Sequence, residues 1–322
     1  MSAQSTPHDY LQPLDCGITV IDTGFVRPRF DAAYLIVEQG RAAYVDTGTN
    51  DALPRLLGAL DAQGLSPDAV DWLIVTHVHL DHAGAAGALM RHLPRARLVV
   101  HPRGARHMID PRMLLDGARA VYGVEEVART YGEVLPVPAE RVLATADDMV
   151  LELADRPLRF IDSPGHARHH HCIWDEASRG WFTGDTFGLS YPELETPVGR
   201  YILPTSTPVQ FEPEALKASI RRMLSAQPQW MYLTHYGRVG AVPQLARLLL
   251  TQIDEMVALA KPLARSPARH DELKTAFAGL YLEHLQRMDS PLTHERLREL
   301  LATDIELNAQ GIGVWLDKPR TA

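Results

Sequence analysis

The chain opens with apolar runs of strand length that are separated by amphipathic helical segments. The runs 32–38 and 41–46 flank Gln39-Gly40, a pair typical of a tight hairpin turn. Residues 51–63 follow with leucines at helical spacing, and the apolar run 72–76 is typical of a strand buried on both faces. Hairpins pair strands antiparallel, whereas strand–helix–strand crossovers pair them parallel. The pattern therefore predicts an α/β fold with mixed sheets.

The same alternation continues to about residue 242. We expect further strands or helices at 17–25, 83–90, 97–101, 151–161, 171–175, 181–185, 214–225 and 230–234. A stretch at about 102–138 is longer than a strand connection requires and carries apolar residues at helical spacing, which predicts a helical insertion. Such an insertion either forms a wall of a substrate pocket or serves as a packing element or dimer contact.

From Pro243 onward the pattern is almost purely helical, with prolines between the helical segments. We therefore predict a domain at 1–242 and a C-terminal helical extension at 243–322. The last helix is expected at 293–308, with Thr293 as its N-cap and Gly311 as its stop. The spacing fits helices that pack on their own domain and equally helices that form a homodimer.

Composition narrows the classes of partner. The formal net charge of -8 and the pI near 6.0 make the average electrostatic interaction with nucleic acid repulsive. No run approaches the ~20 apolar residues that span a bilayer, and the N-terminus lacks the pattern of a signal peptide. We expect a cytoplasmic protein with no membrane or nucleic-acid partner. Cys16 and Cys172 lie far apart and in no zinc-binding spacing, which predicts two buried free thiols.

The run His77-Val78-His79-Leu80-Asp81-His82 carries the strongest chemical signal. In extended backbone, alternate side chains point the same way, so His77, His79 and Asp81 share one side, and a turn into a helix brings His82 alongside. Four ligands within six residues can serve two metal ions. The alternative is a histidine-rich polar loop without metal. The position at a strand end, where α/β sites form, favours the metal site.

This HxHxDH run resembles the signature of the metallo-β-lactamase superfamily. Later elements that resemble the family pattern follow in the same order: Pro164-Gly165-His166, Gly184-Asp185 and His235 after a strand. Asp46 also matches a family position, whose role is mainly structural. The resemblance covers roughly residues 15–240. It implies an αββα sandwich of two mixed β-sheets flanked by helices.

The same resemblance implies a dinuclear metal site. One ion would be held by His77, His79 and His166, the other by Asp81, His82 and His235, with Asp185 as a bridge. We expect two divalent ions, Zn first and Fe or Mn as alternatives, and no organic cofactor. Two ions lower the pKa of a shared water from about 15.7 towards about 7, so a metal-bridging hydroxide would be the nucleophile. Asp81 would orient it and shuttle its proton to the leaving group.

Neighbours of these ligands are candidates for substrate contacts. Phe187 and Tyr191 follow Asp185 closely and would offer an apolar surface, and Tyr236 could donate a hydrogen bond to an oxyanion. His170, in the run that follows His166, is either a substrate contact or a surface or strand-pairing histidine. A small molecule is the expected substrate.

The leading interpretation is hydrolysis of a small ester, thioester or lactone. One alternative is a phosphodiesterase or nuclease-type hydrolase, which the acidic balance disfavours. Another is a non-hydrolytic di-iron redox or oxygen-sensing protein, which is disfavoured because the family's flavin-coupled members usually carry Glu at the position of His79. The runs 101–108 and 165–171 indicate a distinct branch of the family, to which the sequence assigns no substrate.

Overall fold

The computed structural model describes residues 9–318. Their contacts divide the chain into two compact units, each built from several segments. The first unit holds the chain up to Asp162 with His169–Gly184 and Gln229–Arg238, and the second holds Ser163–Arg168, Asp185–Pro228 and the chain from Val239 onward. These units differ from the expected division at residue 242, because the C-terminal helices pack with segments that precede it.

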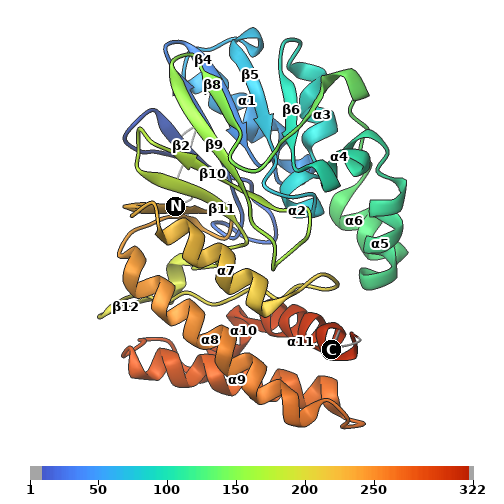
Figure 1. Ribbon diagram of the computed structural model, residues 1–322, viewed down its shortest axis with the longest axis vertical. Helices are drawn as coiled ribbons and strands as arrows, with labels where there is room; N and C mark the ends of the chain where they lie inside the picture. Colours follow the sequence, from blue (N-terminus) through green and yellow to red (C-terminus); the bar gives the residue numbers. More distant parts are fainter. Residues whose placement is uncertain (1–8, 319–322) are drawn as a thin grey trace, which may run out of the picture. The chain divides into compact units, whose positions relative to one another are not determined.

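Two mixed β-sheets account for the strands of the first unit (Figure 1). In spatial order the seven-stranded sheet contains β1 (Leu11–Pro13), β2 (Ile18–Asp22), β3 (Ala32–Glu38), β4 (Arg41–Val45), β5 (Val70–Ile74), β6 (Arg97–Val100) and β7 (Val142–Ala144). The six-stranded sheet contains β15 (Gly237–Val239), β14 (Trp230–Leu233), β11 (Gly180–Gly184), β10 (His171–Asp175), β9 (Arg156–Asp162) and β8 (Val150–Leu153). Pairing is antiparallel from β1 to β4 and parallel from β4 to β7.

The two sheets face each other through aromatic side chains. The ring of Tyr34 on β3 lies 5.2 Å from that of Phe182 on β11 and 5.7 Å from that of Tyr232 on β14, edge-on in both cases. The Tyr34 hydroxyl donates to the carbonyl of Leu233, so its polar end is satisfied inside the core. This is the sandwich that the sequence predicted.

Helices complete the first unit. They are α1 (Leu53–Ala62), α2 (Leu80–Ala83), α3 (Ala86–His92), α4 (Pro102–Ile109), α5 (Arg112–Tyr122) and α6 (Val124–Tyr131). Leucines of α1 and α3 join side chains of β3 to β6 in one buried apolar cluster. The expected insertion at 102–138 is helical, as α4, α5 and α6, although one of its apolar residues, Met113, is 67% exposed.

The second unit contains α7 (Pro213–Leu224), α8 (Val242–Leu263), α9 (Arg269–Arg287), α10 (His294–Leu300) and α11 (Ala302–Asp317), with the short strands β12 (Glu195–Thr196) and β13 (Gly199–Arg200). The long helices α8 and α9 lie side by side (Figure 1). Their buried faces carry Leu245, Leu249, Ile253, Leu273 and Phe277, at the helical spacing read from the sequence. The C-terminal helices are therefore present as predicted.

Three local expectations can be compared with the structure. Thr293 caps α10 as predicted, because its hydroxyl accepts a hydrogen bond from the backbone N–H of Arg296. The predicted stop at Gly311 is wrong, since α11 continues to Asp317. Neither cysteine forms a disulfide, but Cys16 is exposed, so only Cys172 is the buried thiol expected. Among the described residues, no helix has the length and apolar character needed to cross a membrane.

Candidate metal centre

The HxHxDH run connects β5 to α2. β5 ends at Ile74 and α2 begins at Leu80, so the run passes from extended to helical backbone. Val78 belongs to the buried apolar cluster, while the rings of its neighbours His77 and His79 lie 4.4 Å apart. His82, on α2, brings its ring to 4.0 Å from that of His77. The alternation and the turn that the sequence predicted are both present.

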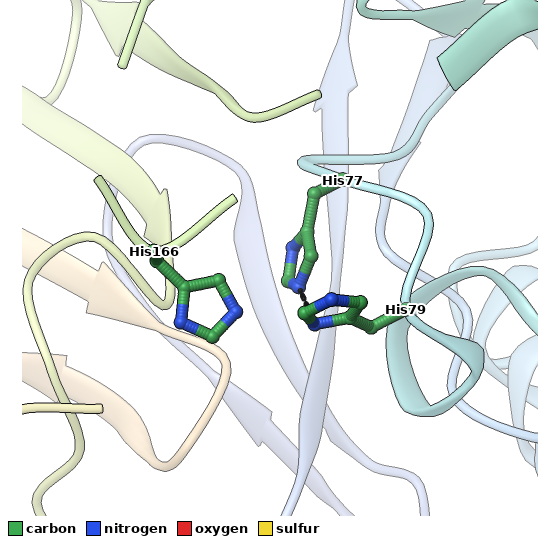
Figure 2. Close-up of side chains that lie close together, drawn as sticks. All are labelled: His77, His79 and His166. Atoms are coloured by element: carbon green, nitrogen blue, oxygen red, sulfur yellow. Dashed lines mark hydrogen bonds between the residues drawn. The ribbon is translucent and has the colours of Figure 1, made fainter. Parts of the chain in front are cut away.

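His77 and His79 form a close pair (Figure 2). Nε2 of His77 lies 2.9 Å from Nδ1 of His79, and the rings are inclined by 76°. Nδ1 of His77 lies 3.2 Å from the hydroxyl of Thr76, which donates its own hydrogen to Asp46. The Thr76 oxygen therefore accepts the Nδ1 hydrogen of His77, and Nε2 is left as the ligand atom of that ring.

Asp46 fixes the two segments that carry four of the candidate histidines. It follows β4 and is 1% exposed. Its carboxylate accepts hydrogen bonds from the backbone N–H of Thr76 at 2.7 Å, from Nδ1 of His82 at 2.8 Å and from the hydroxyl of Thr234 at 2.9 Å. A carboxylate only accepts, so His82 carries its hydrogen on Nδ1 and presents Nε2. Asp46 thus has the structural role that the resemblance implied.

His235 follows β14 and faces Asp81. Its Nδ1 donates to the carbonyl of Phe30 at 3.1 Å, and its Nε2 lies 3.4 Å from Oδ2 of Asp81. The same Asp81 oxygen lies 3.7 Å from Nε2 of His82. The imidazoles of His82 and His235 are almost completely buried, whereas the Asp81 side chain is 24% exposed. Asp81 is therefore the accessible member of this group.

His166 and Asp185 belong to the second unit and are held together by Thr205. Nε2 of His166 lies 3.4 Å from Oδ2 of Asp185. The Thr205 hydroxyl lies 2.8 Å from Nδ1 of His166 and donates to the backbone carbonyl of Asp185 at 3.2 Å. Its oxygen must then accept the Nδ1 hydrogen of His166, which again leaves Nε2 as the ligand atom.

The ligand atoms gather in three groups, and within each group they lie within 4.8 Å of one another. The groups are His77, His79 and His166 (Figure 2); His77, His82 and Asp185; and Asp81, His82 and His235. The first and third are the two sets that the resemblance implied. Imidazole nitrogen and carboxylate oxygen suit Zn, Fe or Mn, so the donor set fits divalent transition metals.

The match to a protein family agrees with this geometry. Residues 26–235 match the family model described as metallo-beta-lactamase superfamily. The chain belongs to the metallo-β-lactamase superfamily. This fold typically binds two metal ions.

Superfamily relatives of this chain carry several names. The metallo-β-lactamase fold-containing protein ST1585 of Sulfurisphaera tokodaii is 23% identical over 229 residues, 70% of this chain and 80% of that protein. Its crystal structure matches with a TM-score of 0.65 and 20% identity, covering 93% of this chain and 99% of that chain, which shows a shared fold. A type A flavoprotein of Rhodobacter capsulatus is 28% identical over 160 residues, 49% of this chain and 32% of that protein. An atrochrysone carboxyl ACP thioesterase of Aspergillus fumigatus is 25% identical over 154 residues, 48% and 38% of the two chains.

The histidines that follow His166 pack around the superfamily motif. His170 is fully buried, and its ring stacks on that of His77 at 4.8 Å. His169 is 7% exposed with its ring 5.4 Å from that of His79, and burial lowers its pKa to about 3. His171 accepts from the Thr145 hydroxyl and donates to the Val75 carbonyl, and burial lowers its pKa to about 3 as well. Burial therefore keeps His169 and His171 neutral, and His170 packs against the candidate ligand His77.

The expected substrate contacts lie deeper than the sequence indicated. Phe187 and Tyr191 have no exposed surface, and the Tyr191 hydroxyl donates to Asp304 of α11 at 3.1 Å. They are core residues in this structure, which corrects the expectation of an open apolar surface. Tyr236 is 6% exposed beside His235, and His170 has no exposed surface. Substrate contacts by Tyr236 and His170 stay predictions.

Two further residues of the site were not among the candidates from the sequence. Thr205 lies in an irregular stretch and is an ordinary residue type, although it contacts two candidate ligands. Asp31 directly follows Phe30 and is fully buried, and burial raises the pKa of its carboxyl to about 7 against the opposing effect of His235 and His82. The only sequence feature that marks Asp31 is its position directly before an apolar strand.

Proposed function

We propose that this chain is a two-metal hydrolase that cleaves a small ester, thioester or lactone. One observation carries the proposal. In His77, His82, His166 and His235, the Nδ1 hydrogen of the ring is held by an oxygen acceptor of the protein. All four rings are thereby oriented with Nε2 as the ligand atom, as metal-binding histidines are in proteins.

The chain's own residues would divide the work in a definite way. His77, His79 and His166 would hold one ion, Asp81, His82 and His235 the other, and Asp185 would be shared. When bound, two divalent ions lower the pKa of water and polarise a carbonyl oxygen, so no Ser or Cys nucleophile is needed. Asp46 and Thr205 keep the imidazoles in the required tautomer, so little reorganisation accompanies the reaction.

Asp81 is the residue we assign to proton transfer. It is a carboxylate with a partly exposed side chain next to two buried imidazoles. A carboxylate in that position can take a proton from the attacking water and return it to the leaving oxygen or sulfur atom. General acid–base catalysis of this kind contributes about 10²–10⁴-fold to a rate.

Two observations bear on the substrate class. The relative named as a thioesterase favours an acyl compound. The net charge of -8 disfavours a polyanionic phosphodiester as the substrate. Together these observations favour a small acyl ester, thioester or lactone.

A panel of substrates tests the proposal. Zinc-loaded protein is assayed with a thioester, a lactone and a phosphodiester before and after chelation. The variants His79→Ala and His92→Ala are assayed beside it. His92→Ala is the control, because the His92 side chain is exposed at the end of α3. We expect hydrolysis of one acyl class that chelation and His79→Ala abolish and His92→Ala leaves unchanged. Metal-loaded protein that is inert towards both acyl classes would overturn the proposal. Iron-loaded protein that reduces dioxygen would overturn the proposal in favour of the non-hydrolytic di-iron alternative.

A further inference from the structure

The segment 204–206 is held by one side chain of the last helix. Asn308 of α11 is 2% exposed. Its Oδ1 accepts hydrogen bonds from the backbone N–H of Ser206 at 2.6 Å and from the Ser206 hydroxyl at 2.9 Å. Its Nδ2 donates to the carbonyl of Pro204 at 3.0 Å and to the hydroxyl of Tyr281 at 2.9 Å. Asn308 therefore fixes the backbone on both sides of Thr205.

A glycine allows the helix to come this close. A Cβ atom added to Gly311 would lie 1.2 Å from the carbonyl oxygen of Ser206, so no larger residue fits without separating α11 from the loop. This contact explains why Gly311 lies inside the helix instead of ending it. The approach of α11 to the loop is thus set by Gly311 and its orientation by Asn308.

Thr205 connects this clamp to the candidate metal ligands. It is the residue between Pro204 and Ser206, and its hydroxyl holds both Nδ1 of His166 and the carbonyl of Asp185. A shift of the loop by a fraction of an ångström would lengthen the 2.8 Å contact between Thr205 and His166. Outer hydrogen-bond partners of metal-binding histidines control metal affinity in this way.

We infer that α11 positions the metal ligand His166, with Asn308 and Gly311 acting through Thr205. The C-terminal helices are then part of the metal centre's support and not a separate appendage. The inference rests on the metal centre of the proposed function, but not on the reaction or its substrate.

Cobalt binding by the full chain tests the inference without an activity assay. The affinity for Co²⁺ and the visible spectrum of the Co²⁺ protein are measured for the unaltered chain and for Asn308→Ala, Thr205→Ala and Thr205→Ser. We expect Asn308→Ala and Thr205→Ala to weaken Co²⁺ binding by about 10–100-fold and to change the spectrum in the same way. Thr205→Ser keeps the hydroxyl and should restore both.

Two controls separate positioning from loss of stability. Leu273→Ala removes a fully buried side chain of α9 that is not in the clamp, so it should destabilise the protein and leave the cobalt spectrum unchanged. Ser206→Ala removes only the hydroxyl contacts to Asn308. It should weaken Co²⁺ binding less than Asn308→Ala does. This variant keeps the test informative if Asn308→Ala does not fold. In the double variant of Thr205→Ala and Asn308→Ala, affinity should fall no further than with Thr205→Ala alone.

The outcomes distinguish this inference from the proposed function. Unchanged cobalt affinity and spectrum in Asn308→Ala and Ser206→Ala, or additive losses in the double variant, overturn the inference and leave the hydrolase proposal in place. Cobalt binding that responds as expected in a protein that hydrolyses no ester upholds the inference and overturns the hydrolase. A chain that binds no cobalt overturns both.

Discussion

The carboxylate of Asp46 accepts a hydrogen bond from Nδ1 of His82 at 2.8 Å, with both side chains buried. Asp46 also accepts from Thr76 and Thr234, the residues that directly precede His77 and His235. One carboxylate therefore joins the ends of β4, β5 and β14, and the segments that follow β5 and β14 carry five of the seven candidate ligands. Its backbone has φ of 58°, the left-handed conformation that aspartate tolerates better than most residues.

Replacement of Asp46 should damage the metal centre, although Asp46 is not one of the candidate ligands. In Asp46→Asn an amide stands where a carboxylate accepts several hydrogen bonds, so His82 loses its charged acceptor and its fixed tautomer. We expect metal affinity to fall by about 10–100-fold. The free energy of unfolding should fall by on the order of 3 kcal/mol, because buried donors lose their acceptor.

Calorimetric titration with Zn²⁺ and denaturant unfolding of the metal-free protein measure the two effects. Asp116→Asn, at an exposed ion pair on α5, is the matched control and should change neither. Zinc affinity that is the same in Asp46→Asn and Asp116→Asn would rule out the role assigned to Asp46.

Gly184 should not tolerate a side chain. Its φ is 47°, and an added Cβ would lie 2.6 Å from Nε2 of His170 and 2.6 Å from Oγ1 of Thr76. Both neighbours support His77, so Gly184→Ala should lower the free energy of unfolding by about 1–3 kcal/mol and weaken zinc binding. Gly64→Ala is the control, because Gly64 has φ of 65° and no atom within 4 Å of an added Cβ. Equal effects of the two substitutions on unfolding and zinc affinity would show that only backbone conformation matters at Gly184.

The stability of the metal-free protein should decrease in acid, in part because of His171. Burial lowers the pKa of His171 to about 3 in the folded protein, below the ordinary histidine value of 6.5. The unfolded chain therefore binds a proton first, so the contribution of neutral His171 is complete above pH 6.5 and is lost as the pH falls towards 3. One such group contributes a slope of about 1.4 kcal/mol per pH unit.

Denaturant unfolding at a series of pH values between 4 and 7 measures that slope. His171→Gln cannot take up the proton, so its unfolding free energy should depend less steeply on pH than that of the unaltered chain. Parallel curves for the two proteins would contradict the assignment, whatever the difference in their absolute stability.

Local sequence patterns were sufficient to predict most strands and the motif residues of the site. Period-two alternation places Val78 in the core and its histidine neighbours on the other side, and this alternation is present in the structure. The predicted hairpin turn at Gln39-Gly40 likewise joins the antiparallel strands β3 and β4. These features depend on residues close together in the chain.

Contacts between distant segments were not predictable in the same way. Asn308 and Ser206 are 102 positions apart, and neither residue type indicates a buried clamp. Gly311 has the appearance of a helix stop, and only the carbonyl of Ser206 against it shows that it is a packing residue. Phe187 and Tyr191 were assigned to a surface from their position after Asp185, whereas the C-terminal helices that bury Tyr191 could not be placed from their periodicity alone.

Metal content, measured on the same samples as hydrolysis, tests the central claim most directly. The protein is loaded with zinc and dialysed, bound metal is determined by mass spectrometry, and acyl-ester hydrolysis is followed during chelation and re-addition. Two equivalents of zinc per chain are expected, with about one in His235→Ala and activity that disappears and returns with the metal. A chain that retains less than one equivalent, or that hydrolyses the ester equally well after complete chelation, would contradict the account.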